Sequence, residues 1–182
     1  MPESGKNQFD TLVTPHLATL FRVAYRLVRN TADAQDLVQD TCATACRSLA
    51  EIAAADSPLR WLLRVQQNRF IDAVRRSRSS PIVTAVDSAE DSAADHLDPE
   101  VLLQQSQNEQ LLERAFLQLD AIQRTLLSLR IEGYDLPEIE VITGIDRKVL
   151  SKRLQRARRS LARHLTEQLE GAPQERRTRS NP

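Results

Sequence analysis

Apolar residues recur every three or four positions along two long parts of the chain, and this spacing limits the possible folds more than any other feature. It places apolar side chains on one side of an α-helix, and that side must then be buried against other helices. Only four glycines and 4% aromatic residues argue against extended β-sheets. The sequence therefore predicts an all-α fold with two small helical domains.

The expected domain boundaries follow this periodicity. The helical parts are residues 9–76 and 99–169. Residues 77–98 lack helical spacing and are rich in Ser, Ala and Asp, which is typical of a flexible acidic linker, although an ordered acidic loop is the alternative. Residues 170–182 contain no large apolar side chain, so we expect a disordered tail.

The first part predicts three helices. One helix covers residues 9–29, and the next has Thr31 as its N-cap and ends near Ala53. Pro58 suits the first turn of a third helix over residues 58–76. The core side of this third helix consists of Leu59, Leu62, Leu63, Phe70 and Val74.

The second part predicts a helical block from residue 99, a helix that restarts at Asp120 and ends near residue 130, and a short helix over residues 136–142. Gly144 forms a tight turn, and a last long helix begins after Asp146. The expected core residues of this part are Leu112, Ala115, Phe116, Leu119, Leu150, Leu154, Ala157, Leu161 and Leu165.

The segment DAQDLVQD at residues 33–40 has two different sides. At 3.6 residues per turn, Asp33, Asp36 and Asp40 form an acidic stripe that faces water or a basic partner. Acids in the first turns of a helix also favour its dipole without any partner. The opposite stripe is expected to face a core and consists of Ala34, Leu37, Val38, Thr41, Cys42 and Ala45.

The formal net charge is zero, but residues 147–163 contain eight Lys or Arg and no acid. The segment LPEIEVITGIDRKVLSKRLQRARRSL has the form of a helix-turn-helix, whose second helix can enter the major groove of DNA. A solvated basic helix on a bundle is the alternative. The residues expected to reach DNA are Arg147, Lys148, Ser151, Lys152, Gln155, Arg156 and Arg159.

The third expected helix carries a second basic surface opposite its core side. An aromatic ring among arginines and an asparagine suits unpaired bases, because the ring can stack while Arg binds phosphate. For Trp61, packing against a neighbouring helix is the alternative. The residues on this side are Trp61, Arg64, Asn68, Asp72, Arg75 and Arg76.

Other functions find little support. The histidines at 16, 96 and 164 are scattered without a nucleophile–base pair or metal cluster, so we expect no catalytic residue, no metal and no cofactor. Cys42 and Cys46 lie one turn apart without further ligands nearby, which favours core packing over metal binding. Without a signal peptide or an apolar run of about 20 residues, the expectation is a cytoplasmic protein with no membrane insertion.

Three segments resemble the extracytoplasmic-function (ECF, group IV) sigma factors of the bacterial sigma-70 family. The first, LFRVAYRLVRNTADAQDLVQDT, resembles the start of the second sigma domain, and SPLRWLLRVQQNRFIDAVRR resembles its promoter-melting and −10 segment. The third, LERAFLQLDAIQRTLLSLRIEGYDLPEIEVITGIDRKVLSKRLQRARRSL, resembles the fourth sigma domain. The resemblance covers residues 9–76 and 100–168 in the family's order.

The resemblance implies a non-enzymatic subunit that binds core RNA polymerase, recognises −10 and −35 promoter elements and helps to melt DNA in response to a stress or signal. The DLVQ helix would dock on the clamp helices of the β′ subunit, with the β flap as a further contact and an anti-sigma factor as an expected partner. The implied polymerase-binding residues are Asp33, Asp36, Leu37, Gln39 and Asp40.

The resemblance also assigns DNA contacts. The loop Ala54–Pro58 falls where an unstacked base is captured, and residues 147–159 fall on the helix that reads the −35 element. The linker 77–98 falls where the family's acidic linker runs toward the active-site and RNA-exit channels. The residues that fall where the −10 element is recognised and opened are Asn68, Arg69, Asp72, Arg75 and Arg76.

Several positions depart from the family's pattern. Asp120 stands where Pro usually follows Leu119, and Glu140 occupies a usually small position in the first helix of the helix-turn-helix. A buried Glu140 would need a partner: it could pair with a cation of the last helix, or, without one, it would loosen the helix-turn-helix. Two other functions fit parts of the sequence: a helix-turn-helix regulator that never binds polymerase, and a sigma-like decoy for an anti-sigma protein.

Overall fold

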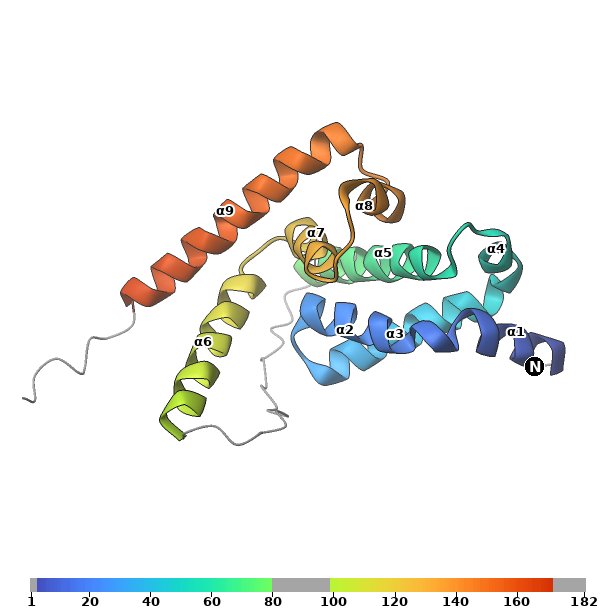
Figure 1. Cartoon of the computed structure of the whole chain (residues 1–182), viewed down its shortest axis with the longest axis horizontal. Helices are drawn as coiled ribbons and strands as arrows, with labels where there is room; N and C mark the ends of the chain where they lie inside the picture. The colour runs from blue at the N-terminus through green and yellow to red at the C-terminus, as the bar shows by residue number, and fades with distance from the viewer. Residues whose placement is uncertain (1–2, 80–98, 172–182) are drawn as a thin grey trace, which may run out of the picture.

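The computed structural model describes residues 3–79 and 99–171, and within these ranges every regular element is a helix (Figure 1). The all-α prediction is therefore confirmed. The N-terminal region contains α1 (Glu3–Leu12), a 3-10 turn η1 (Thr14–His16), α2 (Leu17–Val28), α3 (Thr31–Arg47), α4 (Leu49–Ala54) and α5 (Pro58–Ser79). The C-terminal region contains α6 (Pro99–Leu117), α7 (Ala121–Ile131), α8 (Leu136–Thr143) and α9 (Arg147–Gly171).

The expected linker and tail lie mostly outside the described residues. Helix α5 continues to Ser79, three residues beyond the predicted end, so the start of the predicted linker is helical. Residues 80–98 and 172–182 are outside the description, and the predictions of a flexible acidic linker and a disordered tail there stay predictions.

Helices α2, α3 and α5 enclose the core of the N-terminal region. Leu20 and Leu27 of α2 pack with Leu62 and Leu63 of α5, and all four side chains are almost fully buried. On α3, the side opposite the acidic stripe faces this core as expected. Its buried residues are Ala34, Leu37, Thr41 and Ala45, and Val38 and Cys42 are half-buried.

The single helix predicted over residues 9–29 is wrong, because the chain breaks between α1 and α2. Pro15 lies in the 3-10 turn that replaces the helix there. Proline has no backbone N–H to donate, and its ring clashes with the carbonyl four residues earlier in an α-helix. The break lets Val13 turn inward, where it is fully buried.

Two details of the next predicted helix are also wrong. Asn30, and not Thr31, is the N-cap, because the Asn30 side chain accepts a hydrogen bond from the Asp33 N–H at 3.0 Å. The helix expected to reach Ala53 is interrupted at Ser48, whose backbone is not helical. The separate helix α4 can therefore turn Ile52 fully into the core.

Capping boxes fix the starts of α7 and α8. Asp120 and Asp135 each form a capping box, the first with Gln123 and the second with Glu138. Asp120 therefore replaces the family's proline with another device that starts a helix. Gly144 ends α8 with a φ of 67°, a left-handed conformation that glycine adopts without a steric cost.

One predicted core residue of this region is exposed. Leu112 has 42% of its surface accessible, whereas Ala115, Phe116 and Leu119 are buried as predicted. Leu111, its neighbour, is half-buried instead. Helix spacing allows either leucine to face inward, and the position of α9 against α6 decides between them.

The two regions pack against each other. Helix α7 contacts α2, and α8 contacts α5, so the helix-turn-helix lies beside the first region (Figure 1). Arg124 joins the regions by donating to the Leu27 carbonyl at 2.9 Å and by lying over the Phe70 ring at 5.0 Å from its centre. A salt bridge of 3.1 Å between Arg29 and Glu113 adds a further contact.

Candidate functional site

The acidic surface of α3 consists of Asp33, Asp36, Gln39 and Asp40, and all four side chains are exposed. No ion pair within the described ranges involves these three aspartates, so their charges are open to a partner. Leu37 was also assigned to polymerase contact, but it is only 8% exposed and belongs to the core. We therefore leave Leu37 out of this surface, because its side chain positions α3 from within.

The outward side of α5 carries the cations assigned to the −10 element. Arg64, Arg69, Arg75 and Arg76 are exposed there, together with Asn68 and Asp72. Arg69 donates a hydrogen bond to the Thr44 hydroxyl at 3.0 Å, which links α5 to α3. Asp72 lies 3.9 Å from Arg75 and accepts from Arg76 through its backbone carbonyl at 3.4 Å. Local contacts thus hold Arg69, Arg75 and Arg76 and leave all three exposed.

Trp61 and the two cysteines have mixed environments. Trp61 is half-buried and packs against the core, so packing accounts for part of its ring and leaves the rest accessible. Cys42 also packs against the core, and burial together with the neighbouring Cys46 raises the pKa of its thiol. Core packing does not explain Cys46, which is exposed. No group of three potential metal ligands occurs among the residues the structure describes.

Two buried glutamines of α5 were missed by the sequence reasoning. The Gln66 side-chain amide donates to the Leu20 carbonyl at 2.8 Å, and the Gln67 amide donates to the Ile142 carbonyl at 2.5 Å. The signal was their position on the same side as Leu63 and Phe70. Gln66 fixes α5 to α2, and Gln67 fixes α5 to α8 of the other region.

Every residue assigned to the −35 element is exposed on α9. The opposite side of α9 packs into the core through Leu150, Leu154 and Ala157, which are buried. The carbonyl of Glu140 accepts from the Gly144 N–H at 2.8 Å, which closes the turn between α8 and α9. This arrangement leaves one side of α9 free along its basic part.

Glu140 pairs with the first residue of α9. One carboxylate oxygen accepts from the Arg147 N–H at 3.0 Å, and the other lies 4.0 Å from the Arg147 Nε. The side chain of Glu140 is 37% exposed, so it lies at the surface and is not buried. The expected pairing with a cation of the last helix is confirmed.

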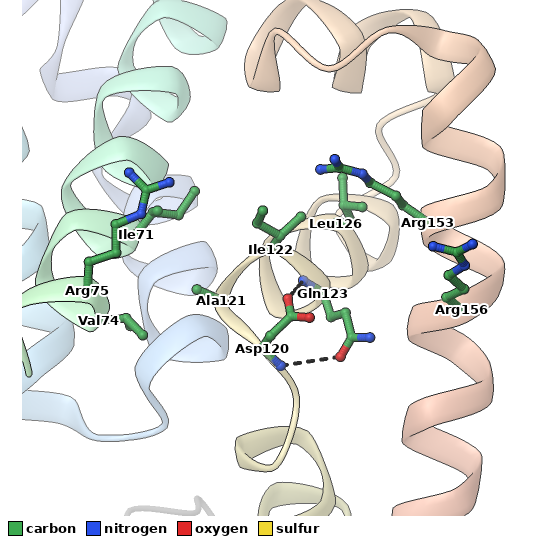
Figure 2. Close-up of a pocket in the computed structure, with 10 residues that line it drawn as sticks. All are labelled: Ile71, Val74, Arg75, Asp120, Ala121, Ile122, Gln123, Leu126, Arg153 and Arg156. Carbon is green, nitrogen blue, oxygen red and sulfur yellow. Dashed lines mark hydrogen bonds between the residues drawn. The ribbon is translucent and has the colours of Figure 1, made fainter. Parts of the chain in front are cut away.

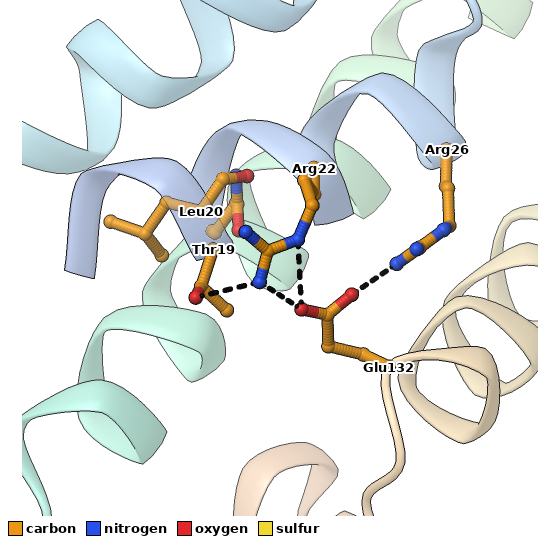
Figure 3. Close-up of polar contacts among 6 residues, drawn as sticks. Thr19, Leu20, Arg22, Arg26 and Glu132 are labelled. Atoms are coloured by element: carbon orange, nitrogen blue, oxygen red, sulfur yellow. Dashed lines mark hydrogen bonds and ion pairs between the residues drawn. The ribbon is translucent and has the colours of Figure 1, made fainter.

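Glu132 is a further charged residue that the sequence did not single out. It accepts from Arg22 through Nε at 3.1 Å and Nη2 at 2.6 Å, and its second oxygen accepts from Arg26 (Figure 3). Only 10% of its side chain is accessible. Burial alone would raise the pKa of Glu132, but the hydrogen bonds and charges of the two arginines outweigh it and lower that pKa below its ordinary value.

A cavity of about 500 Å³ lies between α5, α7 and α9 (Figure 2). It brings Arg75, assigned to the −10 element, to the same space as Arg156, assigned to the −35 element. Its other lining residues are Ile71, Val74, Asp120, Ala121, Ile122, Gln123, Leu126 and Arg153.

Comparisons with known proteins identify the family of the chain. Residues 12–80 match the model of sigma-70 region 2, and residues 109–161 match that of sigma-70 region 4. The ECF RNA polymerase sigma factor SigE of Mycolicibacterium smegmatis is 30% identical over 175 residues, which cover 93% of this chain and 68% of that protein. SigL of Mycobacterium tuberculosis is 30% identical, over 86% of this chain and 88% of that protein.

Two solved structures share the fold. The sigma factor RpoE from Bartonella quintana, in complex with the anti-sigma factor NepR, has a TM-score of 0.67 and 24% identity, covering 87% of this chain and 96% of its own. CnrH, in complex with the cytosolic domain of CnrY, has a TM-score of 0.56 and 23% identity, covering 87% and 88%. None of the described helices is both long and apolar enough to cross a bilayer. By its sequence relatives and its two family regions, the chain belongs to the extracytoplasmic-function sigma factors of RNA polymerase.

Proposed function

We propose that this chain is an alternative sigma factor that binds core RNA polymerase, recognises −10 and −35 elements and promotes DNA melting. The observation that carries the proposal is the order of three exposed surfaces on the matching regions: the acidic surface of α3, the basic side of α5 and the basic side of α9. The chain catalyses no reaction itself, and it works in the cytoplasm, where polymerase and DNA are found.

The acidic surface of α3 is the proposed docking site for the clamp helices of the β′ subunit. Its aspartates are exposed and form no ion pair with any residue that the structure describes, so their charges are available to a basic partner. Such complementarity accelerates and orients docking more than it adds affinity. The C-terminal region would make a second contact at the β flap.

The basic sides of α5 and α9 are the proposed promoter-reading surfaces. On α9, Arg147 can pair bidentately with guanine and Gln155 with adenine. On α5, the arginines can hold phosphates while the accessible part of Trp61 stacks on an unpaired base. The loop before Pro58 is the proposed site for a captured base.

An anti-sigma factor is the proposed regulatory partner. Two solved structures that share the fold contain a bound partner protein. RpoE was determined with the anti-sigma factor NepR, and CnrH was determined with the cytosolic domain of CnrY. Proteins that co-purify with the chain from its source would identify this partner.

Binding of the purified chain to bacterial core RNA polymerase tests the docking surface. Asp36→Arg should weaken binding by at least tenfold, because it places a cation against a basic partner. Glu51→Arg on α4 makes the same charge change at another exposed acid and serves as the control. An equal affinity for both variants and the wild type would remove the proposed role of α3.

A further inference from the structure

The start of α9 is occupied by carboxylates of the chain itself. Glu140 accepts the Arg147 N–H at 3.0 Å, and Asp146 accepts the Lys148 N–H at 2.8 Å. Glu140 also lies 4.0 Å from the Nε of Arg147. Two backbone donors and one cation of the first turn are therefore already engaged.

This occupation changes what the first turn can do with DNA. A free helix start attracts phosphate, because its N–H groups and dipole favour an anion. Here a phosphate would lose those two donors and would approach two negative charges. The six cations from Lys152 to Arg163 have no acid beside them in the sequence, so phosphate binding is favoured further along the helix.

We propose that Glu140 is a positioning residue that determines −35 specificity: it keeps phosphate away from the start of α9 and holds Arg147 toward base edges. The inference rests on the proposed function of α9. The carboxylate approaches Arg147 at Nε, which leaves the two Nη groups for a bidentate pair with guanine. Arg147 then contributes sequence discrimination instead of general affinity.

The test uses the full chain assembled with core polymerase on a promoter found by transcription of genomic fragments. The upstream base pairs are randomised, and the transcribed templates are sequenced for the wild type, Glu140→Ala and Glu140→Gln. Binding of each holoenzyme to the unrandomised promoter is measured against salt concentration. Glu167→Ala is the matched control, because Glu167 lies 3.7 Å from Arg163 at the other end of the same helix.

Glu140→Ala should reduce discrimination at the base pair read by Arg147 by about tenfold. It should also steepen the plot of log binding constant against log salt concentration by about 0.9, which corresponds to one added phosphate contact. Glu140→Gln keeps an acceptor for the Arg147 N–H, so it should retain more discrimination than Glu140→Ala while its slope also steepens. The sequence preference of Glu167→Ala should match that of the wild type.

The outcomes separate this role from the proposed function. A wild type that selects no upstream sequence would overturn the reading by α9 and this role together. If the wild type selects an upstream sequence, and Glu140→Ala selects the same sequence with the same salt dependence, only the role of Glu140 is overturned.

Discussion

Helices α5 and α9 both carry arginines that we propose contact the promoter, but the two helices are packed into the molecule in different ways. Helix α5 contacts α2, α3, α4, α7 and α8, and its glutamines bond to the backbones of two other helices. Helix α9 contacts α6, α7 and α8 along one side and leaves its basic side open. Both helices carry their exposed cations opposite a buried side, but α5 is held by five other helices and α9 by three.

The largest expected difference concerns stability. Phe70→Ala should lower the free energy of unfolding by about 3–5 kcal/mol, because the ring is 3% exposed and Arg124 lies over it. Leu161→Ala on α9 should cost less, because that side chain is only half-buried. Urea unfolding of both variants measures the two values, and equal losses would contradict the comparison.

Promoter opening should distinguish the arginines of the two helices. Arg75→Ala with Arg76→Ala should reduce open complexes at least tenfold while leaving core binding unchanged, because we propose that these cations hold the strand that is melted. Arg156→Ala with Arg159→Ala should mainly reduce the salt dependence of promoter binding, by about 1.8 in log–log slope. Permanganate reactivity of unpaired thymines measures opening. Wild-type reactivity in the α5 variant would remove its assigned role.

Acidification should weaken the contact between the regions. The two arginines hold the pKa of Glu132 below its ordinary value of 4.5 in the folded chain. Its stabilisation is therefore complete above the unfolded value and is lost as the pH falls through the lower folded value. The free energy of unfolding of Glu132→Gln should fall less than that of the wild type below about pH 4.5. Parallel pH profiles would show that Glu132 is not coupled to folding.

The smallest expected effect is at a helix start beside α9. Asp120→Ala should cost about 1 kcal/mol, because it removes the oxygen that accepts the Gln123 N–H at 2.8 Å. Thermal unfolding measures the loss. Asp120→Asn, which keeps a capping oxygen, should retain most of the stability, and an equal loss in both variants would assign the effect to charge instead of capping.

Local chemistry made much of the fold predictable. Helical spacing identified the helices around Leu62 and Leu154, and capping signals placed the starts at Asp120 and Pro58. The break at Pro15 was also readable, because a proline inside a helical pattern predicts an interruption. It was missed because the apolar spacing continues on both sides of it.

Contacts between distant parts of the chain were not predictable in this way. Nothing local in Glu132-Gly133-Tyr134 indicates that the carboxylate lies between Arg22 and Arg26, which are more than 100 residues away in the sequence. Likewise, glutamine is usually exposed in proteins, and Gln67 is buried only because α8 lies beside it. The exposure of Leu112 depends in the same way on where α9 lies. The assigned DNA-binding residues on α5 and α9 stay predictions.

Transcription by core RNA polymerase with and without the purified chain, on fragmented genomic DNA of its source, tests the central claim most directly. The account predicts new, discrete start sites that appear only with the chain and that share two upstream elements about 25 base pairs apart. Identical transcripts with and without the chain, although it binds DNA sequence-specifically by itself, would contradict the account and favour a helix-turn-helix regulator.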